Sequence, residues 1–224
     1  SYLCILLIKT AMIEDVNRVL LPEPTLRRLP WYLAYVNMLH GQNIEYVSST
    51  QIAKEINVDA SQIAKDLSFL NIKGKTRIGY QVEHLATELS NFLGFHEVHK
   101  AFMIGVGSLG AALIQDSGLM QYGLRIVAGF DVDERSIGTE ICGVPIYDVA
   151  QLDMRQKEYG ADIGVLAVPV EHAQASADKL QRSGVKAIWN FTPFRIKVAD
   201  DVVIQNTSIY AHLAVMYNRI NCKK

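Results

Sequence analysis

The spacing of apolar residues changes part-way along the chain. Before about Gly94, apolar residues recur at the three- and four-residue intervals of helices, with short turns between them. From Ala101 onward, short β-rich runs alternate with helical runs. The short polar segment GFHEVHKA joins the two parts. The pattern predicts an N-terminal helical domain followed by a C-terminal α/β domain.

The C-terminal half has the alternation that is typical of a doubly wound parallel sheet, with helices on both faces. One helix is expected to follow the first strand as far as about Tyr122, and Gly184 is a good C-cap for a later helix. The last helix, Ser208–Asn221, has a single apolar stripe. The strands are expected at 101–105, 124–130, 143–148, 161–169, 186–191 and 202–206.

A glycine turn follows the first of these strands. Gly105, Gly107 and Gly110 have the G-x-G-x-x-G spacing that brings a pyrophosphate against a helix N-terminus. Asp131 lies at the end of the next strand, where a carboxylate holds ribose hydroxyls and repels a 2′-phosphate. The pattern favours NAD over NADP. A ligand-free tight turn is the alternative, and coenzyme A binds similar turns.

Little of the chain is left for a substrate domain. After Phe191 about 33 residues remain, holding one predicted strand and one helix. His172 is the only candidate base, and a histidine at a helix start is more often structural. We therefore expect a sensing pocket and assign no catalytic residue.

The N-terminal half has the signature of a helix-turn-helix. Ser48 with Gln51 forms a capping box before one short helix, and Asp59 with Gln62 repeats it before a second. A preceding helix, in which Pro30 suits the first turn, packs on both. In the second short helix, Ile63, Leu67 and Leu70 are expected to face inward, and Gln62, Lys65, Asp66 and Phe69 outward.

A basic hairpin, Asn71–Tyr80, follows as a candidate wing. From Gln62 to Tyr80 there are four basic residues and one acidic residue. Such a local excess suits DNA phosphates, while the helix enters a major groove. A helical protein-interaction domain with solvated charges is the alternative. The predicted DNA contacts are Ser48, Ser49, Gln62, Lys65, Ser68, Lys73, Lys75, Arg77 and Tyr80.

Composition adds limits. The 224 residues have a formal net charge of −1, so any DNA-binding charge must be local. The three cysteines are far apart, which argues against a disulfide framework or a zinc site and fits a reducing cytosol. No metal site is expected, His96–His99 included. The apolar N-terminus is too short to span a bilayer, and Met12 is an alternative start.

The chain resembles Rex, the bacterial redox-sensing transcriptional repressors, from about Leu21 to Ile220. The motifs TLRRLPWYL, VSSTQIAKEINVDASQIAKDLS, GKTRIGYQVEHL, GVGSLGAAL, FDVDERSIG, VPVEHAQ and NFTP stand in family order. The resemblance implies a homodimer that binds palindromic operator DNA and releases it when NADH, rather than NAD+, is bound. It implies an N-terminal extension (1–20), a winged-helix domain (21–94), a Rossmann domain (95–207) and a C-terminal helix exchanged between subunits (208–224).

The resemblance also implies the cofactor contacts. The glycine turn would hold the pyrophosphate, Asp131 the adenosine ribose, and Pro169 with the segment 190–193 would lie towards the nicotinamide. The expected cofactor residues are Gly105, Val106, Gly107, Ser108, Leu109, Gly110, Asp131, Val132, Val168, Pro169, Asn190 and Pro193.

Three positions depart from the family pattern. Ala64 replaces an arginine of the recognition helix. In the family, an aspartate at the start of the exchanged helix pairs with an arginine of the winged-helix domain. Arg28 matches that arginine, but Ser208 replaces the aspartate. Asp116 replaces a tyrosine near the nicotinamide, and it either supplies the carboxylate that Ser208 lacks or repels the nicotinamide. We expect Arg28, Asp116 and Ser208 to belong to the switch. Three alternatives remain. The protein is a regulator that responds to another adenine nucleotide, a regulator that does not discriminate NADH from NAD+, or a small NAD- or CoA-binding enzyme.

Overall fold

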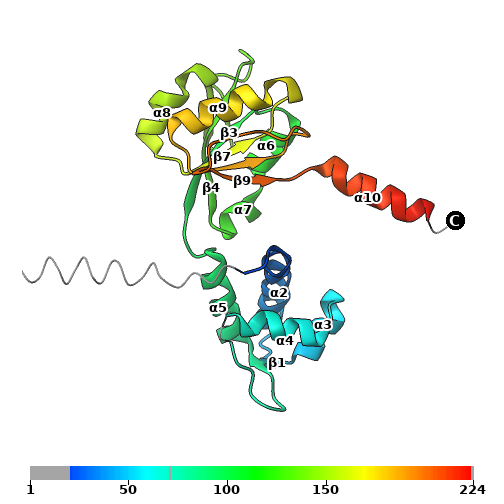
Figure 1. Cartoon of the computed structure of the whole chain (residues 1–224). Helices are drawn as coiled ribbons and strands as arrows, with labels where there is room; N and C mark the ends of the chain where they lie inside the picture. Colours follow the sequence, from blue (N-terminus) through cyan, green and yellow to red (C-terminus); the bar gives the residue numbers. More distant parts are fainter. Residues whose placement is uncertain (1–20, 71, 223–224) are drawn as a thin grey trace, which may run out of the picture. The chain divides into compact units, whose positions relative to one another are not determined.

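The structure is a computed structural model that describes residues 21–70 and 72–222 (Figure 1). The expected N-terminal extension (1–20) and the alternative start at Met12 lie outside these residues. The chain forms two compact units that divide between Phe95 and His96.

Over residues 21–70 and 72–95, the N-terminal unit is a small helical domain with one two-stranded sheet. Its core is closed by fully buried side chains from four helices, among them Leu29, Ile52, Leu67 and Leu85. Strand β1 pairs antiparallel with β2. The elements are α2 (Glu23–Gly41), β1 (Tyr46–Val47), α3 (Ser49–Ile56), α4 (Ala60–Ser68), β2 (Tyr80–Gln81) and α5 (Val82–Leu93).

Local capping explains where α3 and α4 begin. The predicted capping box of Ser48 and Gln51 is confirmed, with the Gln51 N–H donating to Ser48 Oγ at 3.1 Å. The prediction of a second capping box, by Asp59 and Gln62, is wrong. Asp59 caps α4 by accepting from the N–H of Ser61 at 2.7 Å, while the Gln62 side chain turns away towards Asp66.

The outward orientation expected for Asp66 is also wrong, because this side chain is fully buried. It faces α2, whose Arg28 and Tyr32 bind the carboxylate. A buried carboxylate is stable only with such partners, and these lie 38 and 34 residues away in the chain. The helical pattern of α4 alone could not reveal them.

The segment expected to form a wing makes a tight basic turn. Lys75 and Gly79 form an isolated bridge, and Arg77 between them has a left-handed backbone (φ 64°). Tyr80 belongs to β2, whose partner β1 the sequence pattern did not predict. Asn71 lies outside the described residues. The paired strands therefore bring this turn next to the N-terminus of α3.

The C-terminal unit contains a seven-stranded sheet in the order β5-β6-β4-β3-β7-β8-β9. Only β5 is antiparallel, and the other six strands have the doubly wound Rossmann order, which confirms the predicted fold class. The strands are β3 (His99–Ile104), β4 (Leu124–Asp131), β5 (Glu140–Ile141), β6 (Val144–Asp148), β7 (Ile163–Leu166), β8 (Ala187–Asn190) and β9 (Val203–Asn206).

Helices cover both faces of this sheet. Phe102 and Ile104 of β3 pack towards Leu152 and Leu180 of α8 and α9, whereas Met103 packs towards α6 on the opposite face. The helices are α6 (Ser108–Gln115), α7 (Ser117–Gln121), α8 (Leu152–Tyr159) and α9 (Ala173–Ser183), with short 3₁₀ turns at Val149–Gln151 and Val170–His172.

The single helix expected from the glycine turn to Tyr122 is instead two helices. The chain leaves helical geometry at Asp116, whose Oδ1 accepts from the N–H of Gly118 at 2.8 Å and so caps α7. An aspartate inside a helical pattern is ambiguous, because the same side chain can cap a new helix.

The last helix, α10 (Ile209–Asn221), contains no buried residue, and its apolar stripe is exposed. Ile209, Met216, Tyr217 and Ile220 are each about half exposed. Ser208 caps the helix by accepting from the N–H of Ala211. An exposed apolar stripe of this kind marks an interaction surface, and its exchange with a second subunit remains a prediction.

Candidate cofactor cleft and DNA-reading surface

The three glycines of the turn after β3 have different structural reasons. Gly105 has a φ of +86°, and a Cβ there would lie 2.6 Å from the carbonyl oxygen of Ala167. A Cβ on Gly110 would overlap the carbonyl oxygen of Gly105. A Cβ on Gly107 would meet no atom within 4 Å. The fold itself therefore requires Gly105 and Gly110, whereas Gly107 leaves open space at the N-terminus of α6, where a pyrophosphate fits.

A cleft of about 460 Å³ lies over this turn, at the carboxyl ends of β3, β4 and β7. This is the point where the strand order reverses, the usual ligand site of a doubly wound sheet. Of the expected cofactor residues, the cleft brings together Gly105, Val106, Gly107, Asp131, Val132, Val168 and Pro169.

Asp131 is tied directly to the glycine turn. Its Oδ2 accepts from the N–H of Val106 at 2.7 Å, and its Oδ1 accepts from the N–H groups of Val132 (2.7 Å) and Asp133 (3.1 Å). These bonds fix the carboxylate at the mouth of the cleft. The carboxylate has about four lone-pair sites and these bonds use three of them, so Oδ2 can still accept from one ribose hydroxyl.

The cleft also contains side chains that the sequence reasoning did not assign to the cofactor. Ser136 follows Asp131 in the loop after β4, His172 lies in the turn before α9, and Ser176 and Lys179 lie in α9. Helical spacing after Pro169 places Ser176 and Lys179 on one face (i, i+3), a signal that could have found them.

Other expected cofactor residues lie outside the cleft lining. Ser108, Leu109 and Gly110 lie in α6, and Pro193 lies in the loop after β8. The side chain of Asn190 is fully buried and satisfied within the protein. Its Nδ2 donates to the Phe194 carbonyl oxygen and to Asn206 Oδ1, and its Oδ1 accepts from the N–H of Thr192. Asn190 thus holds the 192–194 turn against β9.

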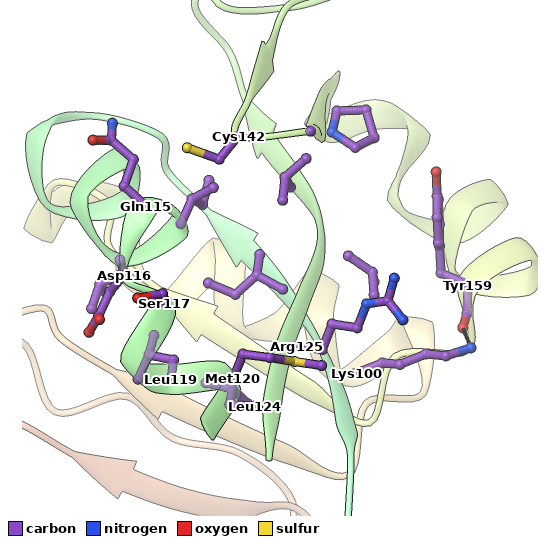
Figure 2. A pocket seen from close by; sticks show the side chains of 17 residues that line it. Lys100, Gln115, Asp116, Ser117, Leu119, Met120, Leu124, Arg125, Cys142 and Tyr159 are labelled. Carbon is purple, nitrogen blue, oxygen red and sulfur yellow. Dashed lines mark hydrogen bonds between the residues drawn. The ribbon is translucent and has the colours of Figure 1, made fainter. Parts of the chain in front are cut away.

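Asp116 lines a different and larger cavity, of about 880 Å³ (Figure 2). Figure 2 shows it beside Gln115 and Ser117, with Arg125 and Lys100 on other elements of the wall. Lys100 Nζ donates to the Tyr159 carbonyl oxygen at 2.9 Å. Lys100 and Arg125 lie near the amino ends of β3 and β4, away from the glycine turn. The smaller cleft is therefore the candidate nucleotide site, and Asp116 does not line it.

In the N-terminal unit, the expected DNA contacts lie on α4, on the basic turn and at the start of α3. Lys65, Ser68, Lys73, Lys75 and Arg77 are exposed. Ser48, Ser49, Gln62 and Tyr80 are partly buried, and a Cβ on Gly74 would lie 3.2 Å from the Tyr80 ring. Lys75 Nζ donates to the Tyr46 hydroxyl at 3.2 Å.

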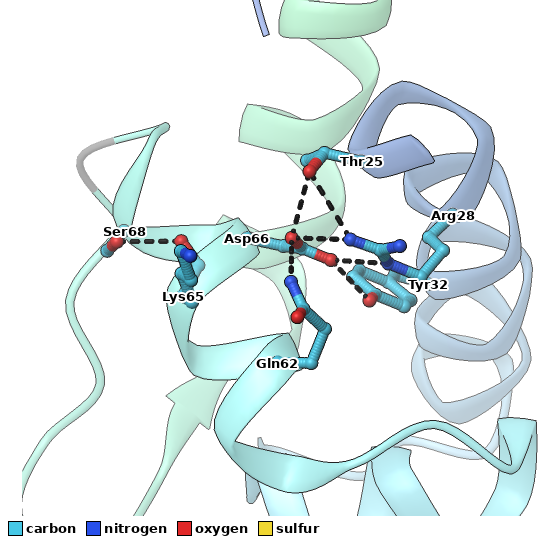
Figure 3. A network of polar contacts seen from close by, with 7 residues as sticks. All are labelled: Thr25, Arg28, Tyr32, Gln62, Lys65, Asp66 and Ser68. Atoms are coloured by element: carbon cyan, nitrogen blue, oxygen red, sulfur yellow. Dashed lines mark hydrogen bonds and ion pairs between the residues drawn. The ribbon is translucent and has the colours of Figure 1, made fainter. Parts of the chain in front are cut away.

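A polar network joins α4 to α2 (Figure 3). Asp66 Oδ2 accepts from Arg28 Nε and from the Tyr32 hydroxyl, both at 2.7 Å, and Oδ1 accepts from Gln62 Nε2 at 2.8 Å. Burial raises the pKa of the Asp66 carboxyl, but the hydrogen bonds from Arg28, Tyr32, Gln62 and Thr25 outweigh it and leave this pKa below its ordinary value.

The same network engages Arg28, which we expected to take part in the switch. The Asp66 bond, partly offset by burial, raises the pKa of the Arg28 guanidinium. In this structure its carboxylate partner is therefore a residue of its own unit. Among the described residues, no group of three or more histidine, cysteine, aspartate or glutamate side chains is arranged to hold a metal, and no helix has the length and apolarity of a membrane span.

Comparison with known proteins places the chain in a family. Residues 21–68 match a family model described as "Putative DNA-binding protein N-terminus", and residues 96–194 match one described as "CoA binding domain". The redox-sensing transcriptional repressor Rex of Bacteroides thetaiotaomicron is 58% identical over 209 residues, covering 93% of this chain and 95% of the relative. The chain belongs to the Rex family. The Rex of Porphyromonas gingivalis is 56% identical over 202 residues, covering 89% and 91%.

Solved Rex structures have the same fold. RSP, a Rex-family repressor, was solved in complex with NAD+ and operator DNA. That structure has a TM-score of 0.87 and 33% identity, and it covers 92% of this chain and 95% of RSP. The complex of RSP with NADH has a TM-score of 0.82 at the same identity, covering 92% and 97%. The resemblance drawn from the ordered motifs is thus confirmed.

Proposed function

We propose that this Rex-family protein represses transcription by binding operator DNA as a homodimer, and that NADH releases it. The observation that carries the proposal is the cleft, in which Asp131 is tied to the glycine turn, in a chain whose N-terminal unit matches a DNA-binding family model. RSP, with the same fold over 92% of this chain, was solved with NAD+ and operator DNA and with NADH. A protein of this function acts in the cytoplasm.

The coupling follows from linkage. If NADH binds more tightly to a conformation that cannot hold the operator, then operator DNA weakens NADH binding by the same factor. NAD+, which leaves DNA bound in this proposal, has no such preference. The match to a CoA-binding family model makes coenzyme A the competing ligand. No residue has a catalytic role in the proposal.

The proposal is tested by measuring affinity for an operator that the protein itself selects from random inverted-repeat duplexes. NADH is expected to weaken binding, whereas NAD+ and coenzyme A leave it unchanged. Equal operator affinity in all nucleotides would contradict nucleotide sensing. Release of the operator by coenzyme A but not by NADH would show that NADH is not the ligand.

Asp131→Ala is expected to reduce the preference for NADH over NADPH by about tenfold or more, since one repulsive interaction of about 1.4 kcal/mol with the 2′-phosphate is removed. Both affinities fall, because the N–H of Val106 loses its acceptor, so the ratio is the measurement. Asp162→Ala is the control. Its carboxylate is paired with Lys186 at 2.7 Å and lies outside the cleft lining, so the ratio should not change; an unchanged ratio in Asp131→Ala would remove this aspartate from the ribose site.

The basic turn gives a separate prediction about DNA. Alanine at Lys73, Lys75 or Arg77 is expected to lower the slope of log affinity against log salt by about 0.9 for each phosphate that is no longer neutralised, without changing sequence preference. Titration of the operator at several salt concentrations measures the slope. Lys157→Ala, an exposed basic residue of α8, should leave it unchanged. A wild-type slope in all three variants would exclude the turn from the interface.

A further inference from the structure

The side chain of Gln62 is bound by a buried residue of the N-terminal unit. Gln62 lies in the first turn of α4 and is partly exposed, where the reading helix of a helix-turn-helix meets base edges. Its Nε2 donates to Asp66 Oδ1 at 2.8 Å. An ionised carboxylate only accepts hydrogen bonds, so the amide nitrogen must face Asp66. The amide therefore cannot flip, and its oxygen Oε1 is directed away from Asp66.

Asp66 is itself immobilised from α2. Its Oδ1 also accepts from Thr25 Oγ1 at 3.1 Å and from Arg28 Nη2 at 2.9 Å, while Arg28 Nε and Tyr32 bind Oδ2 (Figure 3). With both oxygens bound and the side chain fully buried, the carboxylate has one orientation. Through it, α2 fixes the side chain of Gln62.

We infer that Asp66 is a positioning residue that orients Gln62 to read an adenine in the operator, an inference that rests on the proposed DNA-binding function. The outward edge of the amide has the acceptor Oε1 and the second N–H of Nε2. A glutamine edge of this kind pairs with N6 and N7 of adenine in the major groove. Lys65, exposed on the same helix, is a point charge without such a directional pair.

The test uses full-length protein and the duplexes that the wild type enriches from a random pool, with each base pair then substituted in turn. Gln62→Ala should lose, at one adenine position per half-site, a preference of at least about fivefold. Asp66→Asn should lose the same preference, because asparagine can also donate and so permits the amide to flip. The double variant should lose no more than either single variant.

Two controls separate positioning from general damage. Tyr32→Phe removes a bond to Oδ2, the oxygen that Gln62 does not use, and should keep the adenine preference. Lys65→Ala should weaken operator binding but keep the adenine preference. Gln62→Asn is too short to reach Asp66 and leaves Asp66 and Arg28 unchanged, so it keeps the test valid if Asp66→Asn fails to fold; it too should lose the preference.

The outcomes are distinct. An adenine preference retained in Gln62→Asn or in folded Asp66→Asn overturns the role of Asp66. A Gln62-dependent position that prefers guanine, or the absence of any such position, overturns the reading of adenine. If the wild type enriches no duplex at all, the proposed function fails instead.

Discussion

Gly107→Val is expected to produce a folded repressor that no longer responds to NADH. A Cβ at this position meets no protein atom within 4 Å, so the loss of stability should be that of a poorer N-cap of α6, about 1 kcal/mol. The added side chain occupies the space that a pyrophosphate would take at the N-terminus of α6. Losing two charge-assisted hydrogen bonds of about 1.5 kcal/mol each corresponds to about 100-fold weaker NADH binding.

Calorimetric titration with NADH and a thermal melt check this prediction, and operator binding without nucleotide should stay at the wild-type level. Gly110→Ala is the matched control, because its Cβ overlaps the Gly105 carbonyl oxygen; it should lower the melting temperature as well as the NADH affinity. Undiminished NADH affinity in Gly107→Val would move the cofactor away from this turn.

Asp66→Ala is expected to destabilise the N-terminal unit by about 3–5 kcal/mol, the usual result of removing one partner of a buried ion pair. Arg28, whose side chain is 20% exposed, would keep its charge without the carboxylate. Operator binding should be lost while NADH binding persists, because the C-terminal unit has its own cores. Hydrogen exchange resolved to 21–95 and 96–222 would locate the change.

Glu23→Ala is the control for this variant, since its pair with Arg27 on the same helix is exposed at both ends (70% and 61%). Such a pair contributes about 0–1 kcal/mol, so little should change. Equal effects of the two substitutions would contradict a structural role for the Asp66 network.

The same carboxylate gives the unit a pH dependence. Its pKa is lower in the folded state than the ordinary value of about 3.9. The stability that it contributes is therefore complete above about pH 4 and is lost as the pH falls through the folded value. Acid unfolding of Asp66→Asn should lack this component. A fall in stability between pH 8 and 6 would have to arise from other groups.

Local patterns predicted what depends on neighbours in the sequence. The six parallel strands, the Ser48 capping box and the glycine turn with Asp131 each follow from residues a few positions apart or from regular alternation. The burial of Asp66 could not be predicted in this way, because it depends on α2. The same holds for Asn190, whose partners include Asn206 on a neighbouring strand.

The different structural requirements of the three glycines have a consequence for the interpretation of related sequences. A homologue that no longer bound a nucleotide would still need Gly105 and Gly110 for its backbone conformation, whereas other residues could replace Gly107. A sequence search that scores the glycine motif as a whole would still classify such a homologue as a nucleotide sensor. The residue at position 107 would instead distinguish homologues that bind a nucleotide from homologues that keep only the fold.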